Sequence, residues 1–573
     1  MTACTIAGIV RARANSRRAD EVAIRFKDGA SWTAWTWREF WEAACTAGTG
    51  LLESGVRPGD HVLVAVADVR PAVACLFGLW AIGAVPIQIG LPFRLTDRAA
   101  FLPQLVETAR RLDARFLLAS QALSSFAPPG AIKVLTAEDM ISAESAVSLR
   151  TDELSATAFI QLTSGTTSRP RGVVIPHDRL MLHLEHISHA LPSHSESVAV
   201  SWLPLHHDMG LIGGLLFPIY NGFPAYMIST ADFQRQPWVW LETMSRFRAT
   251  MCAAPTSAYA MCVSLAQRLS GANLDLSAWE CAMVGAEPIS AALLRRFSAA
   301  FAPYGFRPEA FFPVYGLAEA TVAVTFPELL CPVRVDRIDR VKLECEGRAT
   351  PEDADGSTLE FVSVGRAIPG SEIRIVDESG VALPERMIGE IVVRAETLSA
   401  GYYGEPEATA EAVRDGWLRT GDLGYQADQL LFVTGRKKEI IIKAGHNLIP
   451  SALEEIVAEV AGVRGGAVAA VGVRSAARET EMVWIVAETR LDAGEYEALS
   501  QSIRAALKSH GVVVDRVLLT PPKTLPKTTS GKIQRLAIAR MLETDRSDLN
   551  KAELRQFAEI IQNRPQLRAE TGD

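Results

Sequence analysis

One short stretch has side chains well suited to binding an anion. It is LTSGTTSRPRG, at residues 162–172, and it combines small and hydroxyl-bearing residues with two arginines. The preceding residues, 158–162, predict a strand that leads into this loop. Backbone N–H groups in such a loop can converge on phosphate oxygens, and serine and threonine hydroxyls add donors. The stretch lacks the Gly-Lys-Ser/Thr sequence of the Walker loop. Taken alone, it is compatible with a phosphate-binding loop and with an ordinary surface turn.

Two further stretches put a carboxylate just beyond a predicted apolar strand. In VYGLAEAT, Tyr315 follows the strand and Glu319 lies on the next turn, while in MVGAEP the strand leads into Gly285, Ala286 and Glu287. An aromatic ring at a strand end can stack on a purine, and a nearby carboxylate can hold a Mg²⁺ ion that bridges phosphates. Each stretch alone is equally compatible with a plain strand–turn and a solvated carboxylate.

Three polar residues of the second half could complete such a site. Asp422, in RTGDLG, lies in a predicted tight turn where a carboxylate can accept hydrogen bonds from two ribose hydroxyls. Arg436, in VTGRKKEIIIK, could reach the same ribose. Lys532, in LPKTTSGKIQR, lies on a predicted Gly–Ser turn that could bring it into a site. A lysine on a loop is more often only a solubilising charge, so no one of these stretches decides the function.

Size and composition restrict the class of protein that carries these stretches. A chain of 573 residues exceeds one hydrophobic core, so at least two domains are expected. The net charge of -8 disfavours nucleic acid as the main partner, because phosphate backbones require clustered basic surface. Eight scattered cysteines without a C-x-x-C pair predict buried thiols in a reducing compartment, and with no signal-like N-terminus we expect a cytoplasmic protein.

The hydrophobic pattern predicts an α/β fold with a large N-terminal domain at residues 1–435 and a small α/β domain at residues 436–573. Strand-like and helical runs alternate up to about residue 312, which predicts parallel-rich sheets covered by helices. The uncharged run at residues 71–93 is broken by glycine and proline, so it predicts a buried helix and strand instead of a membrane span. From residue 361, short alternating strands predict a β-rich subdomain.

In this order and spacing, the stretches resemble the adenylate-forming (ANL) superfamily of acyl- and aryl-CoA synthetases, peptide-synthetase adenylation domains and luciferases, from about Trp32 to Arg535. The segment SWLPLHHDMGLIGGLLFPIYNGFPAYMIS at residues 201–229 and the segment GHNLIPSALEE resemble the fatty acyl-AMP ligase branch. That branch carries an insertion after YGLAEAT, and residues 332–360 occupy that place here. A variable surface loop is the alternative interpretation of these residues.

The resemblance implies ATP-dependent activation of a medium- or long-chain fatty acid to acyl-AMP with release of pyrophosphate, followed by acyl transfer to the phosphopantetheine thiol of an acyl carrier protein. ATP and Mg²⁺ are the implied cofactors. A fatty acyl-CoA ligase is the main alternative, and a non-catalytic nucleotide-binding component of a synthase complex is the second. The C-terminal domain is implied to rotate between the two steps about a hinge near Lys438.

The resemblance also implies a role for each polar stretch. Lys532 would bridge the reacting oxygens, and Glu319 would hold Mg²⁺ as the second catalytic residue. Phosphate binding falls to Thr163, Ser164, Gly165, Thr166, Thr167 and Arg171. The adenine and adenylate pocket would comprise Gly285, Ala286, Glu287, Tyr315, Gly316, Leu317 and Ala318, and the ribose would bind Asp422 and Arg436. Relatives usually have glycine at the position of Ser168 and lysine at that of Arg171.

An acyl pocket is expected on a strand end and the apolar helix that follows it. Its walls would be Trp202, Met209, Ile212 and Leu215, with His207 and Asp208 at the mouth. His207 could equally be a core histidine bonded to Asp208 or a gate for the acyl chain. No acidic residue is apparent where amino-acid-activating relatives bind the substrate ammonium, which favours an uncharged apolar tail.

Overall fold

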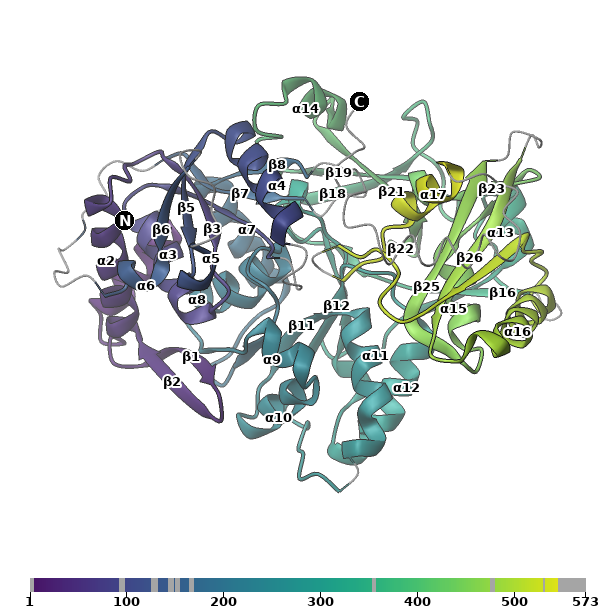
Figure 1. Ribbon diagram of the computed structural model, residues 1–573, viewed down its shortest axis with the longest axis horizontal. Coiled ribbons are helices and arrows are strands. Elements are labelled where there is room, and N and C mark those ends of the chain that lie inside the picture. The colour runs from purple at the N-terminus through teal and green to yellow at the C-terminus, as the bar shows by residue number, and fades with distance from the viewer. Residues whose placement is uncertain are drawn as a thin grey trace.

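The structure is a computed structural model of the whole chain. It describes residues 5–91, 98–124, 132–142, 149, 155–163, 170–269, 271–352, 357–474, 480–528 and 531–544. Figure 1 shows the first part of the chain, in purple and blue, at one end of the molecule and the C-terminal part, in yellow-green, at the other. The teal strands and helices of the middle of the chain lie between them.

Two helix-covered sheets form the first two thirds of the chain. The first has the order β6-β5-β3-β4-β7-β8. Its strands are β3 (His61–Ala65), β4 (Val85–Gln88), β5 (Ala114–Ala119), β6 (Lys133–Thr136), β7 (Thr157–Leu162) and β8 (Gly172–Pro176). All neighbours are parallel except β7 and β8, which pair antiparallel around the predicted phosphate loop.

The second sheet has the order β13-β12-β11-β9-β10-β1-β2 and is parallel except for the hairpin of its first two strands. Its strands are β1 (Val22–Asp28), β2 (Ser31–Thr36), β9 (Ala199–Ser201), β10 (Ala225–Met227), β11 (Met251–Pro255), β12 (Cys281–Gly285) and β13 (Phe311–Pro313). The predicted parallel-rich arrangement is confirmed, and each sheet ends in one antiparallel edge strand that the alternation of strands and helices did not predict.

Most helices of this part bury one face, and α3 (Val69–Ala81) is buried from Pro71 to its end. Two of them, α2 (Trp37–Glu53) and α3, pack closely because glycines face each other: a Cβ on Gly78 would lie 2.8 Å from the backbone nitrogen of Gly48. The predicted buried helix and strand at residues 71–93 are confirmed as α3 and β4. Among the described residues, no helix is long and apolar enough to cross a membrane. Other helices here are α1 (Ile6–Ala14), α4 (Arg98–Arg111), α7 (His177–Ala190), α10 (Trp238–Arg246), α11 (Thr256–Leu265) and α12 (Ala291–Phe301).

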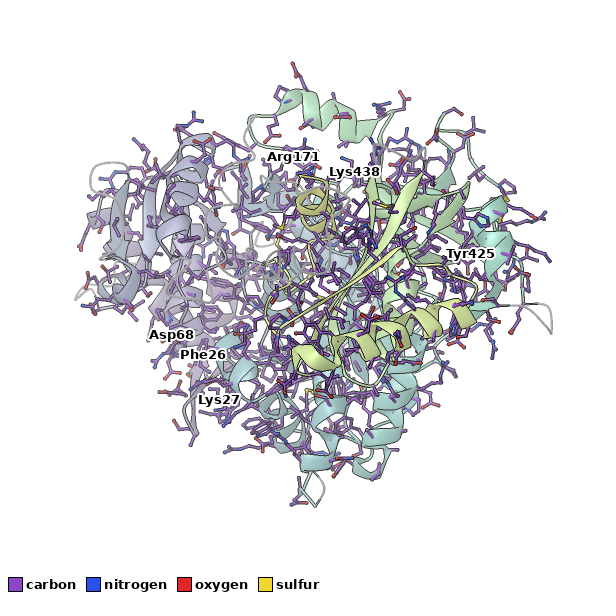
Figure 2. The ribbon with its side chains drawn as sticks, turned by 45° about the vertical axis from the view of Figure 1, so that its right-hand side comes forward. Phe26, Lys27, Asp68, Arg171, Tyr425 and Lys438 are labelled. Atoms are coloured by element: carbon purple, nitrogen blue, oxygen red, sulfur yellow. The ribbon has the colours of Figure 1, made fainter. Side chains whose placement is uncertain are left out.

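A five-stranded antiparallel sheet forms the predicted β-rich subdomain. It contains β18 (Ser371–Val376), β19 (Gly389–Ala395), β20 (Val413–Arg414), β21 (Trp417–Ala427) and β22 (Leu430–Arg436). The next elements are a single helical turn at Lys437–Glu439 and the hairpin of β23 (Ile441–Lys443) and β24 (His446–Leu448). Lys438, the predicted hinge, lies in that helical turn, and Figure 2 labels it.

The predicted insertion has secondary structure of its own. Strand β15 (Val335–Asp339) pairs antiparallel with β16 (Thr358–Val362), and α13 (Arg340–Glu346) lies between them. Buried side chains of the insertion, such as Ile338 and Leu343, share a hydrophobic cluster with Ile449 from the C-terminal part. The Arg340 guanidinium, almost fully buried, pairs with Glu344 at 2.7 Å and donates to the carbonyl of His510 at 3.2 Å. The insertion is therefore packed against the C-terminal part of the chain.

The C-terminal part has a core of its own. Its sheet comprises β25 (Val463–Arg474), β26 (Glu481–Thr489) and β27 (Arg516–Thr520), and its helices are α15 (Pro450–Ala458), α16 (Tyr496–Ser509) and α17 (Arg535–Thr544). Apolar side chains on both faces of this sheet are buried, for example Ile485 and Trp484. The α/β character expected for this part is confirmed, while the domain boundary at residue 435 stays a prediction.

Candidate active site

The two predicted carboxylate stretches meet at one edge of the second sheet. Strands β12 and β13 are parallel neighbours, with Val284 opposite Pro313, so the residues that follow each strand emerge side by side. Close approach explains the glycines: a Cβ on Gly285 would lie 2.8 Å from Val314, and one on Gly316 would lie 1.7 Å from the Val322 carbonyl oxygen. Ala286 has a φ of +66°, a strained value for a residue with a side chain.

A buried carboxylate links this edge to the β-rich subdomain. The Tyr315 hydroxyl donates to Asp422 Oδ2 at 2.8 Å, and Arg436 Nε lies 3.1 Å from Asp422 Oδ1. Asp422 on β21 faces Arg436 on β22 in the register of that sheet. Burial raises the pKa of Asp422, and the charge of Arg436 opposes this rise. Burial is also the main reason that the pKa of Tyr315 is raised well above its usual range, and the nearby Asp422 adds to it. The structure thus brings together three residues that lie far apart in the sequence.

Lys532 reaches the same cluster from the C-terminal part. Its backbone N–H donates to the Thr528 hydroxyl at 3.1 Å, and its carbonyl accepts from the Thr528 N–H at 2.8 Å. Burial lowers the pKa of the Lys532 ammonium, and the Arg436 charge lowers it further. The carboxylates of Asp208, Glu287 and Asp422 act in the opposite direction, so several anionic groups surround this cation.

The two candidate glutamates differ in what holds them. Both Glu287 oxygens accept from Ser257 at the start of α11, one from its N–H at 2.7 Å and one from its hydroxyl at 3.1 Å. Glu319 accepts at Oε1 from the Tyr402 hydroxyl at 2.8 Å. No group of three or more histidine, cysteine, aspartate or glutamate side chains that could hold a metal occurs among the described residues. Glu319 on its own fits a Mg²⁺ ion whose other ligands are phosphate and water oxygens.

The base of the predicted phosphate loop is closed by its own backbone. The Thr163 N–H donates to the Arg171 carbonyl at 2.9 Å, and the Arg171 N–H donates to the Thr163 hydroxyl at 3.1 Å. Four predicted phosphate contacts lie outside the described residues: Ser164, Gly165, Thr166 and Thr167. The Arg171 guanidinium, expected to grip phosphate, contacts Glu405 at 3.2 Å and lies over the Tyr402 ring at 4.9 Å in this structure.

A cavity is lined by residues of this cluster, of the second sheet and of α7, and its empty space, open solvent included, is about 850 Å³. Its polar end is formed by Asp208, Ala286, Tyr315 and Gly316. The remaining walls are largely apolar and are formed by Ile187, Leu191, Ala199, Val200, Met209, Gly213, Gly214, Phe217, Met251, Cys252, Ala253, Cys281, Met283, Val314, Val322, Ala323 and Phe326. The cavity could therefore hold a molecule with one anionic end and a long apolar tail.

Of the four expected walls of the acyl pocket, Met209 lines this cavity and the other three do not. The segment Met209–Leu216 is a π-helix, labelled η2, and Met209, Gly213 and Phe217 face the cavity, while Ile212 and Leu215 are buried in the core behind it. The wider turn of a π-helix places residues four to five apart on one face, whereas the expectation assumed an α-helix. Trp202 does not line the cavity either, because its ring stacks on Phe233 at 3.5 Å in a separate core.

His207 and Asp208, expected at the mouth, are both partly buried, and Asp208 lines the polar end of the cavity. Asp208 accepts a hydrogen bond from the Met209 N–H at 2.7 Å, and the Nε2 of His207 has no partner among the described residues. Among the described residues no hydrogen bond joins the two side chains, so the alternative of a core histidine bonded to Asp208 is not seen here. Burial lowers the pKa of His207 well below its usual range, so this imidazole is neutral near pH 7. Burial also raises the pKa of Asp208, which the Lys532 charge opposes.

The structure adds residues that motif reasoning missed. Tyr402 contacts Glu319, and Ile187, Leu191 and Phe326 line the apolar end of the cavity. The aromatic pair in SAGYYGEP, flanked by glycines, was the one visible signal for Tyr402. The apolar residues of α7 carry no such signal, because they resemble any buried helix face.

Known proteins resemble this chain over most of its length. Residues 10–403 match the model of the family described as AMP-binding enzyme. A Caulobacter vibrioides protein with the provisional name acyl-CoA synthetase is 34% identical over 498 residues, which cover 85% of this chain and 86% of that protein. The medium-chain fatty acid–acyl-carrier-protein ligase JamA of Moorena producens is 35% identical over 396 residues, 66% of this chain and 67% of JamA.

One solved structure, from a study of fatty acyl-adenylate ligases from E. coli and L. pneumophila, superimposes with a TM-score of 0.88 at 30% identity, covering 94% of this chain and 98% of that one. The agreement in fold therefore includes the β-rich subdomain and most of the C-terminal part. The chain belongs to the AMP-binding enzyme family of the adenylate-forming superfamily, and its resemblance to the fatty acyl-AMP ligase branch extends over nearly its whole length.

Proposed function

We propose that this protein activates a medium- or long-chain fatty acid with ATP to form acyl-AMP and pyrophosphate, and then transfers the acyl group to the phosphopantetheine thiol of an acyl carrier protein. One observation carries the proposal. One cavity is lined both by Asp208 and Tyr315 of the polar cluster and by apolar side chains such as Leu191 and Phe326. A carboxylate at the polar end of that cavity would have its tail among apolar side chains.

In the first step, a fatty acid carboxylate oxygen attacks the α-phosphorus of ATP, the new P–O bond forms, and the bond to pyrophosphate breaks. The carboxylate is already ionised, so the protein needs no general base and contributes position and charge. Lys532 would place its ammonium between the attacking carboxylate and the phosphate oxygens, as a cation on a long flexible stem can do. Asp422 and Arg436 would hold the ribose, and Tyr315 would cover the adenine.

Glu319 would bind the divalent cation of the nucleotide, and the phosphates would supply further ligands that do not come from the protein. A bound Mg²⁺ ion neutralises charge on the phosphates during displacement. Thr163 and the four neighbours that lie outside the described residues would donate to the phosphates. Arg171 would contribute to phosphate binding only after leaving Glu405, because the two side chains are paired in this structure.

In the second step, the thiol sulfur attacks the acyl carbon, the C–S bond forms, AMP leaves, and the thiol proton passes to solvent. We expect the C-terminal part to rotate about Lys438 between the steps, which would withdraw Lys532 and admit the thiol. Arg340 bonds to His510, and the insertion packs against Ile449. These contacts would stabilise the arrangement of the C-terminal part in which Lys532 lies in the site. The enzyme would then release its adenylate to an acceptor slowly unless the acceptor itself helps the rotation.

A fatty acyl-CoA ligase is the second candidate, and the provisional name of the Caulobacter relative favours it. The name of JamA favours the carrier protein. The two candidates share the first step and differ only in the thiol that accepts the acyl group.

One assay tests the proposal and separates the candidates. The enzyme is incubated with ATP, Mg²⁺ and fatty acids of graded length, once with CoA and once with holo-acyl carrier protein. We expect acyl-AMP to accumulate with CoA and the carrier protein to be acylated. Rapid acyl-CoA formation would support the second candidate, and absence of any fatty-acid-dependent AMP or acyl-AMP would contradict both.

A further inference from the structure

The loop at residues 399–405 contacts Glu319 through both its main chain and its side chain. The Ser399 N–H donates to the Glu319 carbonyl oxygen at 2.8 Å, and the Tyr402 hydroxyl donates to Glu319 Oε1 at 2.8 Å. Within the described residues, the other carboxylate oxygen of Glu319 accepts no hydrogen bond. One oxygen is therefore fixed by the loop, and the other is left for a ligand.

The loop is itself held on a rigid frame. The Ala400 N–H donates to the Val174 carbonyl at 2.8 Å, and the Val174 N–H donates to the Gly401 carbonyl at 2.9 Å, which extends the pairing of β8. Arg179, on the first turn of α7, donates to the Ser399 carbonyl at 2.7 Å. These bonds fix the start of the loop, so the phenol of Tyr402 extends toward Glu319 from a defined position.

The Tyr402 ring is held on its other side by the base of the predicted phosphate loop. The Arg171 guanidinium lies 4.9 Å from the centre of the ring, and its Nε lies 3.2 Å from Glu405, in the same loop as Tyr402. A cation over an aromatic face is attractive, and a carboxylate partner fixes its position. Figure 2 labels Arg171. A contact path thus runs from Arg171 through Tyr402 to Glu319.

We propose that Tyr402 is a positioning residue that orients the Glu319 carboxylate for the divalent cation of the nucleotide. The proposal rests on the proposed function, in which Glu319 binds that cation. By donating to Oε1, the hydroxyl prevents the carboxylate from turning and keeps Oε2 directed at the cation site. Burial raises the pKa of the Tyr402 phenol, and Glu319 raises it further, so the hydroxyl keeps its proton at neutral and mildly alkaline pH.

The experiment measures ATP binding by calorimetry, with no fatty acid present, once in Mg²⁺ and once in EDTA. It compares the wild type with Tyr402→Phe, which removes only the hydroxyl, and with the matched control Tyr403→Phe. Tyr403 is the adjacent tyrosine, and its ring contacts His61 at 4.9 Å instead of Glu319. The gain from Mg²⁺ is the ratio of the ATP affinity in Mg²⁺ to that in EDTA. We expect this ratio to be about five- to tenfold smaller in Tyr402→Phe than in the wild type, which is the size of effect expected for one hydrogen bond to a charged group. Its affinity in EDTA should stay within about twofold of wild type, and Tyr403→Phe should behave as wild type.

Three outcomes would overturn the inference. One is a full gain from Mg²⁺ in Tyr402→Phe, and another is an equal loss with and without Mg²⁺, which would mean that Tyr402 only supports the nucleotide pocket. The third comes from the Glu319→Gln background, where Tyr402→Phe should cause no further loss of the Mg²⁺-dependent gain; a further loss would show that Tyr402 acts through another group. A wild type that binds no ATP would instead contradict the proposed function itself.

Discussion

The two ends of the cavity are built from different parts of the chain. The apolar end lies on β9, β11 and β12 of the second sheet and on α7, which packs against β7 and β8 of the first sheet. The polar end is assembled from separate segments that carry Asp208, Tyr315, Asp422 and Lys532, the last two from the β-rich subdomain and the C-terminal part. The apolar end therefore exists once one domain has folded, whereas the polar end is complete only when the C-terminal part is docked. We expect changes at the polar end to alter the rate for every substrate, and changes at the apolar end to alter which substrates react.

The largest effect is expected from removal of the cation at the polar end. Lys532→Ala should lower acyl-adenylate formation by about 10³-fold for all chain lengths, because a preorganised charge at the reacting oxygens is lost. ATP affinity should change by no more than a few-fold. Pyrophosphate exchange measures the first quantity and calorimetry the second, with Lys508→Ala on the exposed face of α16 as the control lysine. Adenylation at nearly the wild-type rate would remove Lys532 from the reaction.

A change at the apolar end should instead separate substrates. A Cβ on Gly213 meets no atom within 4 Å, so the position faces open space in the cavity. Gly213→Leu should therefore lower kcat/KM for a long fatty acid by about 100-fold by filling the path of the tail, and leave a short acid within about threefold. Kinetics with acids of graded length check this. A uniform loss across all lengths would mean that the two ends are not independent.

Loosening the insertion should weaken the polar end alone. Arg340→Met leaves Glu344 buried without its partner, which should cost about 3–5 kcal/mol of unfolding free energy, while Arg340→Met with Glu344→Leu should be close to neutral. Adenylation by the single variant should fall several-fold, with the preference for chain length unchanged. Denaturant unfolding and the graded-acid assay check both points. A shifted length preference in this variant would contradict the separation of the two ends.

The last prediction concerns pH. Because burial lowers the pKa of Lys532, the active cation is lost at a lower pH than for a free lysine, and adenylation should fall as the pH rises through that value, approaching about tenfold per pH unit beyond it. The unfolded chain binds the Lys532 proton more tightly than the folded protein does, so the contribution of Lys532 to folding stability increases with pH. Unfolding driven by this group therefore cannot explain a loss of adenylation at high pH.

Burial raises the pKa of the cavity thiols Cys252 and Cys281, so the preference for chain length should not change with pH. The pH–rate profiles of a long and a short acid should therefore be parallel; profiles that diverge would place a titrating group at the apolar end.

The polar and apolar ends of the cavity also differ in how well they could be predicted from the sequence. Ala286 and Tyr315 were predictable because parallel apolar strands place the residues that follow them at one sheet edge. Asp422 meets Tyr315, but it lies within β21 and not in the predicted tight turn. Ile212 and Leu215 do not line the cavity, because a periodicity of 3.6 does not describe a π-helix. Tyr402 could not be assigned, because its bond to Glu319 joins residues 83 positions apart and depends on the tertiary fold.

The most direct test of the account is mass spectrometry of a reaction that contains only the enzyme, ATP, Mg²⁺ and a medium-chain fatty acid. Because the cavity joins an apolar tail site to the Lys532 cluster, we predict acyl-AMP and pyrophosphate in equal amounts, formed without any thiol acceptor. Formation of ADP, or nucleotide turnover that does not depend on the fatty acid, would contradict the account.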